Sequence, residues 1–260
     1  MQPLELYIHI PFCVKKCAYC DFLSGPAGEK EKEEYVKMLV DEIRNCPDTV
    51  QNYRVISIFF GGGTPSLLTG EQIGRLMDTV REIFTLDEDA EITMEMNPGT
   101  VTEEKLRKYR QAGVNRLSIG LQSVNDEELR LLGRIHTYEE FREAYHLARA
   151  NGFSNINVDL ISAIPGQTVE SWRRTLEQVM ALSPEHISAY SLILEEGTTF
   201  YKKYVEDEAK EGPKLPDEDA ERQMYWDTEM LMEKNGYHRY EISNYAKEGY
   251  ACRHNLGYWE

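Results

Sequence analysis

The sequence predicts an α/β protein built as a partial (β/α)6 barrel, a TIM-like parallel sheet that is closed or nearly closed. Six apolar, strand-like runs alternate with amphipathic helical segments over residues 1–200. No internal repeat divides them, and this alternation is typical of a parallel sheet with right-handed crossovers. The run at residues 55–60 is apolar without a break, which is the pattern of a strand buried on both faces.

The strands are expected in chain order at residues 4–10, 55–60, 91–96, 115–120, 155–161 and 186–194. The helices between them are expected to begin near residues 31, 69, 102, 126, 137 and 169. Thr69 with Gln72 and Thr137 with Glu140 have the spacing of capping boxes, and Thr102 is a single cap residue. Each long helix carries apolar residues at helical spacing, so that one face can pack against the sheet.

The composition changes after residue 200. Residues 206–221 are strongly acidic and contain Pro213 and Pro216, so they are expected to form a surface loop. A helix is expected over residues 217–235, ended by Gly236, and the remainder is rich in aromatic side chains. The sequence therefore predicts two parts, a barrel core at 1–200 and a C-terminal region at 201–260.

The overall charge excludes some classes of partner. The chain has 260 residues, of which 45 are acidic and 29 basic, giving a formal net charge of −16. A nucleic-acid or anionic-membrane surface would need a basic patch, and no basic run is present. The chain reaches a strand by Leu4, which leaves no room for a signal peptide, and it contains no apolar run of about twenty residues. We expect a cytoplasmic protein, because free thiols persist in that compartment.

Three cysteines follow the first strand within eight residues, at Cys13, Cys17 and Cys20. Three thiolates this close repel one another unless a cation or a cluster neutralises them. A disulfide would pair two of these cysteines and leave the third as a free thiol. Structural zinc normally takes four protein ligands, and the other cysteines, Cys46 and Cys252, are isolated. A [4Fe–4S] cluster held by three cysteines, with its fourth iron open to another ligand, satisfies the count.

The strand YIHIPF followed by C-x3-C-x-Y-C resembles the signature of the radical S-adenosylmethionine superfamily. More narrowly, it resembles the branch that contains oxygen-independent coproporphyrinogen III oxidase and the heme chaperone HemW. The resemblance covers residues 4–259 and implies the same partial barrel. It also implies that S-adenosylmethionine chelates the open iron, and that an electron donor supplies one electron to release a 5′-deoxyadenosyl radical. Because that family continues for about a further domain, the chain is expected to be truncated at its C-terminus.

The resemblance also assigns contacts with S-adenosylmethionine. The glycine-rich segment Gly62, Gly63 and Thr64 would bring backbone groups against the ammonium and carboxylate of the methionine part. The other positions that match the family's contacts are Tyr7, Tyr19, Glu95, Gln122, Arg134, Asp159 and, through its backbone, Ile193. Arg134 could fork onto the ligand carboxylate, and Asp159, in an apolar strand, needs a hydrogen-bonding partner such as a ribose hydroxyl pair.

Two features distinguish the members of that branch. The oxidase has a further cysteine two residues after the third, where this chain has Phe22. The segment from His254 to Trp259 resembles the H-N-x-x-Y-W element of the heme chaperone, although aromatic packing at the barrel's open edge would also explain it. A neutral imidazole at His254 is a suitable axial ligand for heme, with Cys252 as a weaker candidate.

These features predict a chaperone that binds heme as cargo and delivers it to heme-accepting proteins. The alternative is an oxygen-independent coproporphyrinogen III oxidase, which converts propionate side chains of the porphyrinogen to vinyl groups. Whether the chain turns over a substrate is left open, and no catalytic residue is assigned.

Overall fold

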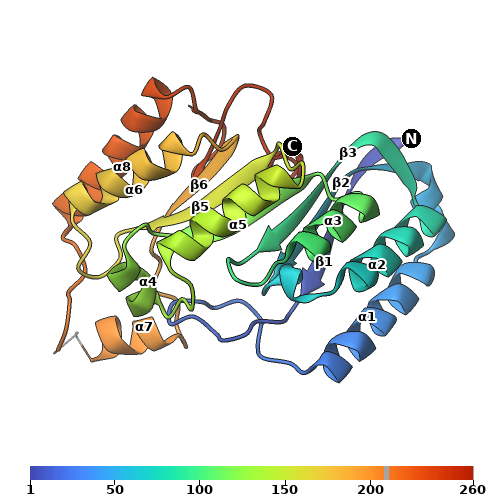
Figure 1. Cartoon of the computed structure of the whole chain (residues 1–260), viewed down its shortest axis with the longest axis horizontal. Helices are drawn as coiled ribbons and strands as arrows, with labels where there is room; N and C mark the ends of the chain where they lie inside the picture. The colour runs from blue at the N-terminus through green and yellow to red at the C-terminus, as the bar shows by residue number, and fades with distance from the viewer. Residues whose placement is uncertain (208–210, 260) are drawn as a thin grey trace.

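The computed structural model describes residues 1–207 and 211–259. Its centre is one sheet in which β1 to β6 run parallel in chain order, followed by β8 and β7 at the far edge (Figure 1). Within the described residues β1 and β7 form the two free edges, so the sheet curls without closing. The predicted partial barrel is confirmed.

The strands are β1 Gln2–Ile10, β2 Tyr53–Gly62, β3 Thr85–Met96, β4 Arg116–Gln122, β5 Ile156–Ser162, β6 His186–Ser191, β7 His238–Arg239 and β8 Asn244–Ala246. The α-helices are α1 Glu29–Arg44, α2 Gly70–Ile83, α3 Glu103–Ala112, α4 Asp126–Leu132, α5 Tyr138–Ala150, α6 Val169–Ala181, α7 Thr199–Tyr201, α8 Glu218–Lys234 and α9 Arg253–Leu256. Short 3-10 turns occur at Asp48–Asn52 and Pro65–Leu67, and a π turn follows α7 at Lys202–Glu206. None of the described helices has the length and apolar content needed to cross a bilayer.

The helix starts that the sequence predicts are present. The Thr69 side chain accepts a hydrogen bond from the Gln72 N–H at 3.2 Å, and the Gln72 side chain accepts one from the Thr69 N–H at 2.9 Å. Thr137 and Glu140 make the same reciprocal pair, and Thr102 caps α3. These bonds satisfy N–H groups that the first turn of a helix leaves without partners, and so they set the helix start.

The two faces of the sheet differ in polarity. Outward-facing side chains such as Val55, Ile58 and Phe60 of β2 are wholly buried under the surrounding helices. The inner face is polar, with buried side chains at Ser57, Glu91, Thr93, Arg116, Ser118, Asn157, His186, Ser188 and Asn244. Because buried polar groups must find hydrogen-bond partners, this face is held together by a side-chain network and not by apolar packing.

The C-terminal region differs in part from its prediction. The helix predicted at 217–235 is α8, which packs beside α6 (Figure 1). The chain then adds β7 and β8 to the sheet, with β8 antiparallel to β6. Strands of two or three residues have no readable periodicity, so the sequence did not predict them. The predicted acidic loop is preceded by α7 and the π turn, and its residues 208–210 lie outside the described part. The division into parts at residue 200 stays a prediction.

Candidate functional site

The three cysteines lie on the loop that leaves β1 at the carboxyl end of the parallel strands. The Cys13 N–H donates to the Gly25 carbonyl at 2.9 Å, and the Ala18 N–H donates to the Leu132 carbonyl at the end of α4, also at 2.9 Å. The Phe200 N–H in α7 donates to the Ala18 carbonyl. Figure 1 shows this loop crossing below the strand ends toward α4 and α7. The loop is therefore fixed at both of its sides.

All three thiols are half-buried and none forms a disulfide. Burial raises the pKa of the Cys20 thiol; a backbone hydrogen bond at Phe22 lowers it, and the nearby Cys17 and Cys13 raise it again. Among the described residues no three His, Cys, Asp or Glu side chains are grouped to hold a single metal ion. A [4Fe–4S] cluster takes each thiolate on a different iron, so its ligands stand farther apart than those of one ion. The donor set, three free thiols on one anchored loop, suits a cluster in its chemistry.

The glycine-rich segment at the end of β2 is hydrogen-bonded to the residues that lead into the cysteine loop. The Gly63 N–H donates to the Ile10 carbonyl at 2.9 Å, and the Thr64 N–H donates to the Phe12 carbonyl at 2.6 Å. The Gly62 N–H donates to the Glu95 carboxylate at 3.1 Å. All three N–H groups are thus paired within the protein. Any backbone contact of this segment with a ligand would use carbonyl oxygens, which suit an ammonium and not a carboxylate.

Gly63→Ala tests whether this close packing supports the cysteine loop. A Cβ at Gly63 would lie 2.6 Å from the Phe12 carbonyl oxygen and 2.9 Å from that of Ile10. We expect a lower cluster content after anaerobic reconstitution and a loss of about 1–3 kcal/mol in the free energy of unfolding, because backbone has to move. Gly25→Ala, in the same loop but with open space around its Cβ position, is the control and should keep the cluster. Equal cluster content in both variants would contradict this role.

Two carboxyl groups, those of Glu95 and Asp159, lie on the inner face of the barrel close enough to interact electrostatically. Burial, and next the charge of Asp159, raises the pKa of Glu95 to about 8 against the lowering effect of the Gly62 N–H. Burial also raises the pKa of Asp159, which accepts hydrogen bonds from Ser118 at 3.1 Å and from the Asn157 amide at 2.7 Å. A ligand that brings an ammonium or hydroxyl donors would relieve this pair, and S-adenosylmethionine carries both.

The raised pKa of Glu95 predicts a pH-dependent stability for the cluster-free chain. The folded state holds this proton more tightly than the unfolded state does, since the pKa rises from 4.5 to about 8 on folding. The free energy of unfolding should therefore be greatest below about pH 4.5, as far as this group contributes, and fall as the pH rises to about 8. Urea unfolding across that range should show the fall, and Glu95→Gln should flatten it. Parallel profiles for the two chains would contradict the assignment.

Gln122 and Arg134 lie beside each other next to Gly120, where a Cβ would approach their side-chain nitrogens to within 3.1 and 3.0 Å. Gln122 has a φ of 77°, an uncommon conformation for a residue other than glycine, and such strain is frequent at functional sites. Arg134 donates to the Asn97 side chain at 2.6 Å and to the Gly120 carbonyl at 2.5 Å. The structure brings the predicted pair together, but a fork onto a ligand carboxylate would compete with these bonds.

The other predicted contacts are more scattered. Tyr7 is half exposed and its ring stacks on Phe59, with centroids 6.1 Å apart. The Tyr19 hydroxyl has a pKa raised mainly by burial, and Arg134 lies close enough to lower it. Ile193 follows the end of β6 and its side chain is exposed. Of these three, Tyr19 stands nearest to the cysteines.

Asn97 is a member of this site that the sequence did not single out. Its amide donates to the Thr64 hydroxyl at 2.8 Å and its oxygen accepts from Arg134. It therefore joins the glycine-rich segment to Arg134. The sequence marks it only as the residue that closes a strand. Its position at the carboxyl end of β3 was the available signal, because ligands of such sheets bind at that end.

His254 lies in α9, which covers the inner face of the sheet beside β2. Its Nδ1 lies 3.0 Å from the Ser57 hydroxyl and its Nε2 lies 3.4 Å from the Tyr258 hydroxyl. The ring stacks on Phe59 with centroids 5.1 Å apart. Burial, and next the charge of Arg116, lowers the pKa of His254 to about 4, so the imidazole is neutral. Its Nε2 is screened by Tyr258, whose own side chain is 72% exposed.

Cys252 is buried more deeply than His254, which is itself only 4% exposed. It is wholly buried, and its thiol donates to the Glu91 carboxylate at 3.3 Å. Burial raises its pKa to about 12. A thiol that is both buried and protonated is a poor ligand, so the structure gives no support to Cys252 as a heme ligand.

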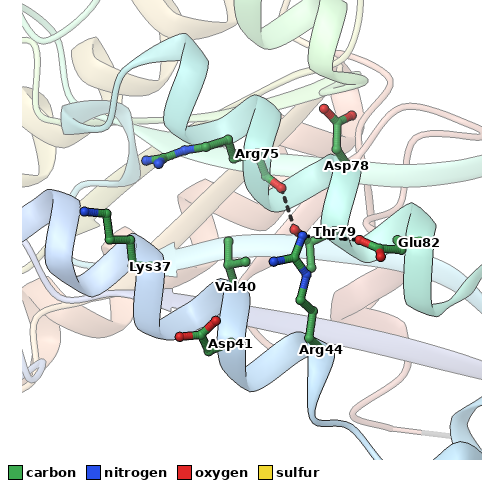
Figure 2. Close-up of a pocket in the computed structure, with 8 residues that line it drawn as sticks. All are labelled: Lys37, Val40, Asp41, Arg44, Arg75, Asp78, Thr79 and Glu82. Carbon is green, nitrogen blue, oxygen red and sulfur yellow. Dashed lines mark hydrogen bonds and ion pairs between the residues drawn. The ribbon is translucent and has the colours of Figure 1, made fainter.

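Among the described residues, grooves are also present outside the cysteine loop. One groove, of about 510 Å³, lies between α1 and α2 on the outside of the barrel, and Figure 2 shows the side chains that line it. Both of its arginines are paired: Arg44 lies 3.4 Å from Glu82, and Arg75 lies 2.6 Å from Glu33. We therefore take it as a surface groove without a ligand role. A second groove of about 550 Å³ borders the C-terminal segment and is lined by Tyr225, Arg239, Tyr240, Glu241, Ile242 and Trp259.

Comparisons with known proteins identify the family of the chain. Residues 7–179 match the family model described as the Radical SAM superfamily. The chain is 45% identical to "Heme chaperone HemW" of Escherichia coli strain K12, over all of this chain and 67% of that protein. It is 39% identical to the protein of the same name in Bacillus subtilis strain 168, over 97% of this chain and 66% of that protein. The chain thus spans about two thirds of the length of these relatives.

A solved structure of coproporphyrinogen III oxidase (HemN) from Escherichia coli, described as a radical SAM enzyme, superposes with a TM-score of 0.85. The two sequences are 32% identical, over 95% of this chain and 56% of that one. The resemblance read from the cysteine motif and the C-terminal segment is confirmed. The chain belongs to the radical SAM superfamily and, within it, to the family of the heme chaperone HemW.

Proposed function

We propose that this chain binds heme and passes it to acceptor proteins, on a barrel that also holds a [4Fe–4S] cluster and S-adenosylmethionine. The observation that carries the proposal is the neutral His254, placed by the C-terminal segment on the inner face of a radical SAM barrel. Relatives of 35–45% identity over nearly the whole chain are named heme chaperones, which supports the same function.

The surroundings of His254 suit an axial ligand of heme iron. With its Nδ1–H donated to the Ser57 hydroxyl, the ring presents a lone pair at Nε2, as metal-binding histidines commonly do. The group next to Nε2 is the hydroxyl of Tyr258, on an exposed ring that can swing away. Movement of this hydroxyl would open Nε2 to heme iron.

The groove beside the C-terminal segment, which includes Trp259 in its lining, has surfaces that suit a tetrapyrrole. Tyr225, Ile242 and Trp259 offer apolar and aromatic surface to a flat macrocycle. Arg239 lies in the same groove, exposed and 3.3 Å from Glu229, and a propionate group would have to displace that carboxylate to pair with it. One ligand that is flat, apolar and acidic at one edge matches this combination.

The cluster would be held by Cys13, Cys17 and Cys20, and when bound it supplies an open iron for the amino-acid part of S-adenosylmethionine. In this proposal Glu95 receives the ammonium, and Asp159 receives hydroxyl donors of the ribose. Tyr7, Tyr19, Gln122, Arg134 and the backbone of Ile193 complete the pocket. The protein's partners would be an electron donor for the cluster and heme-accepting proteins, in the cytoplasm, where thiols stay reduced.

The alternative activity, oxidation of coproporphyrinogen III, is favoured by the superposition on the oxidase structure and is tested directly. The reconstituted chain is given dithionite, S-adenosylmethionine and coproporphyrinogen III under anaerobic conditions. We expect no vinyl product and no 5′-deoxyadenosine that depends on the porphyrinogen. Substrate-dependent formation of both would establish the oxidase and refute the chaperone.

A further inference from the structure

A line of buried hydrogen bonds leads from the C-terminal region to Asp159. The Tyr240 hydroxyl lies 2.8 Å from Nε2 of His186, and Nδ1 of His186 lies 2.6 Å from the side-chain oxygen of Asn157. The amide nitrogen of Asn157 lies 2.7 Å from the Asp159 carboxylate. His186 and Asn157 are 0% and 2% exposed, so water does not replace these bonds.

The protons of this line have only one consistent arrangement, beginning at Asn157. Its amide nitrogen meets the Asp159 carboxylate at 2.7 Å and the Ser118 hydroxyl at 2.7 Å. The reverse orientation of the amide would press its oxygen against the carboxylate, which is repulsive. The oxygen of Asn157 therefore faces His186 and needs a donor there.

Nδ1 of His186 supplies that donor. At 2.6 Å from the oxygen of Asn157, an unprotonated Nδ1 would set its lone pair against that oxygen. The Ser188 hydroxyl is farther away, at 3.2 Å, and it also lies 2.6 Å from the oxygen of Asn244. His186 therefore carries its proton on Nδ1 and donates it to Asn157.

Donors and acceptors can be assigned in the same way from His186 to the C-terminal segment. With Nδ1 protonated, Nε2 of His186 is an acceptor, and the Tyr240 hydroxyl donates to it. The oxygen of Tyr240 then accepts from the Cys252 N–H at 3.3 Å and from the Asn255 amide at 3.2 Å. Every donor in the line points from the C-terminal segment toward Asp159. Bonds aligned in this way polarise one another in a buried site.

We propose that Tyr240 and His186 are positioning residues that hold the Asp159 carboxylate in place and couple it to the segment at residues 252–259. This rests on the proposed function in that Asp159 is taken to bind S-adenosylmethionine and His254, next to Asn255, to bind heme. A shift of the segment when heme binds would then change the hydrogen bond that the Asn157 amide donates to Asp159. By linkage, heme and S-adenosylmethionine would change each other's affinity by the same factor.

Tyr240→Phe removes the hydroxyl at the centre of the line. Measured by equilibrium dialysis on reconstituted chains of equal cluster absorbance, S-adenosylmethionine should bind about tenfold more weakly, since a buried acceptor on His186 loses its donor. Tyr237→Phe is the matched control: its hydroxyl is also buried, but it donates to the Pro184 carbonyl at 2.7 Å and has no path to Asp159. Unchanged affinity in Tyr240→Phe, or the same loss in both variants, would overturn the proposal.

The tautomer of His186 gives a second readout that needs neither heme nor S-adenosylmethionine. In the wild-type chain labelled with nitrogen-15 histidine, nuclear magnetic resonance should show His186 neutral and protonated on Nδ1. A proton on Nε2 would overturn the line of donors. Because this measurement and the dialysis are independent of heme, a failure of heme binding alone would refute the proposed function and leave the positioning roles of Tyr240 and His186 standing.

Discussion

Replacing Cys17 by alanine is expected to abolish both the brown absorbance of the reconstituted chain and the binding of S-adenosylmethionine. Two thiolates cannot replace three on a cluster whose fourth iron is left open for the ligand. The Cys17 backbone carbonyl accepts a bond from the Cys20 N–H, and alanine keeps that bond, so the loop itself should hold. The loss should then follow from the missing sulfur and not from unfolding. Iron content and absorbance measure the cluster, and equilibrium dialysis measures the binding of S-adenosylmethionine.

Cys46→Ala is the matched control for this experiment. Cys46 is also a free, half-buried thiol, but it lies after α1, and its sulfur is 3.8 Å from the Glu42 carbonyl. It should leave iron content and ligand binding unchanged. A full cluster in Cys17→Ala, or an equal loss in Cys46→Ala, would remove the three-cysteine centre from the account.

His254→Ala should weaken heme binding by at least about a hundredfold, because even changes in the residues that support a metal ligand cost about 10–100-fold in affinity. The cluster absorbance should persist, since His254 lies on the inner face beside Ser57 and Phe59 and does not touch the cysteine loop. His146→Ala, on the exposed side of α5, controls for loose binding of heme by surface histidines. An optical titration of heme into the three chains gives the comparison.

Tyr258→Phe separates a lost ligand from a damaged fold. The substitution removes the hydroxyl that lies 3.4 Å from Nε2 of His254 but keeps the ring. Heme should bind at least as tightly as in the wild-type chain, because the nitrogen has lost a competing partner. Weaker binding in Tyr258→Phe, together with wild-type binding in His254→Ala, would place the heme elsewhere.

Features with a local cause could be predicted from the sequence. The capping pairs at Thr69 and Thr137 act within one helical turn, so their residue types alone set the helix starts. The cysteine spacing likewise fixes three thiols on one loop. The predicted contacts with S-adenosylmethionine came from the family resemblance. In the structure, two of these residues, Glu95 and Asp159, lie on the same inner face, close enough for Asp159 to raise the pKa of Glu95.

Features that depend on distant partners could not be predicted. The pairing of the Gly62 and Gly63 N–H groups depends on where Glu95 and β1 lie, and the sequence gives no sign that these donors are already used. The line from Tyr240 to Asp159 joins residues that are about eighty positions apart. Strand β8 has three residues, so only its pairing with β6 defines it as a strand. Each of these needs the three-dimensional arrangement.

The most direct test of the central claim is an anaerobic optical titration of the cluster-loaded chain with heme. We expect saturable, equimolar binding with the spectrum of a histidine-ligated heme, while the cluster absorbance remains. Heme that fails to saturate, or that binds only as the cluster is lost, would contradict a chaperone that carries heme at His254 on an intact radical SAM centre.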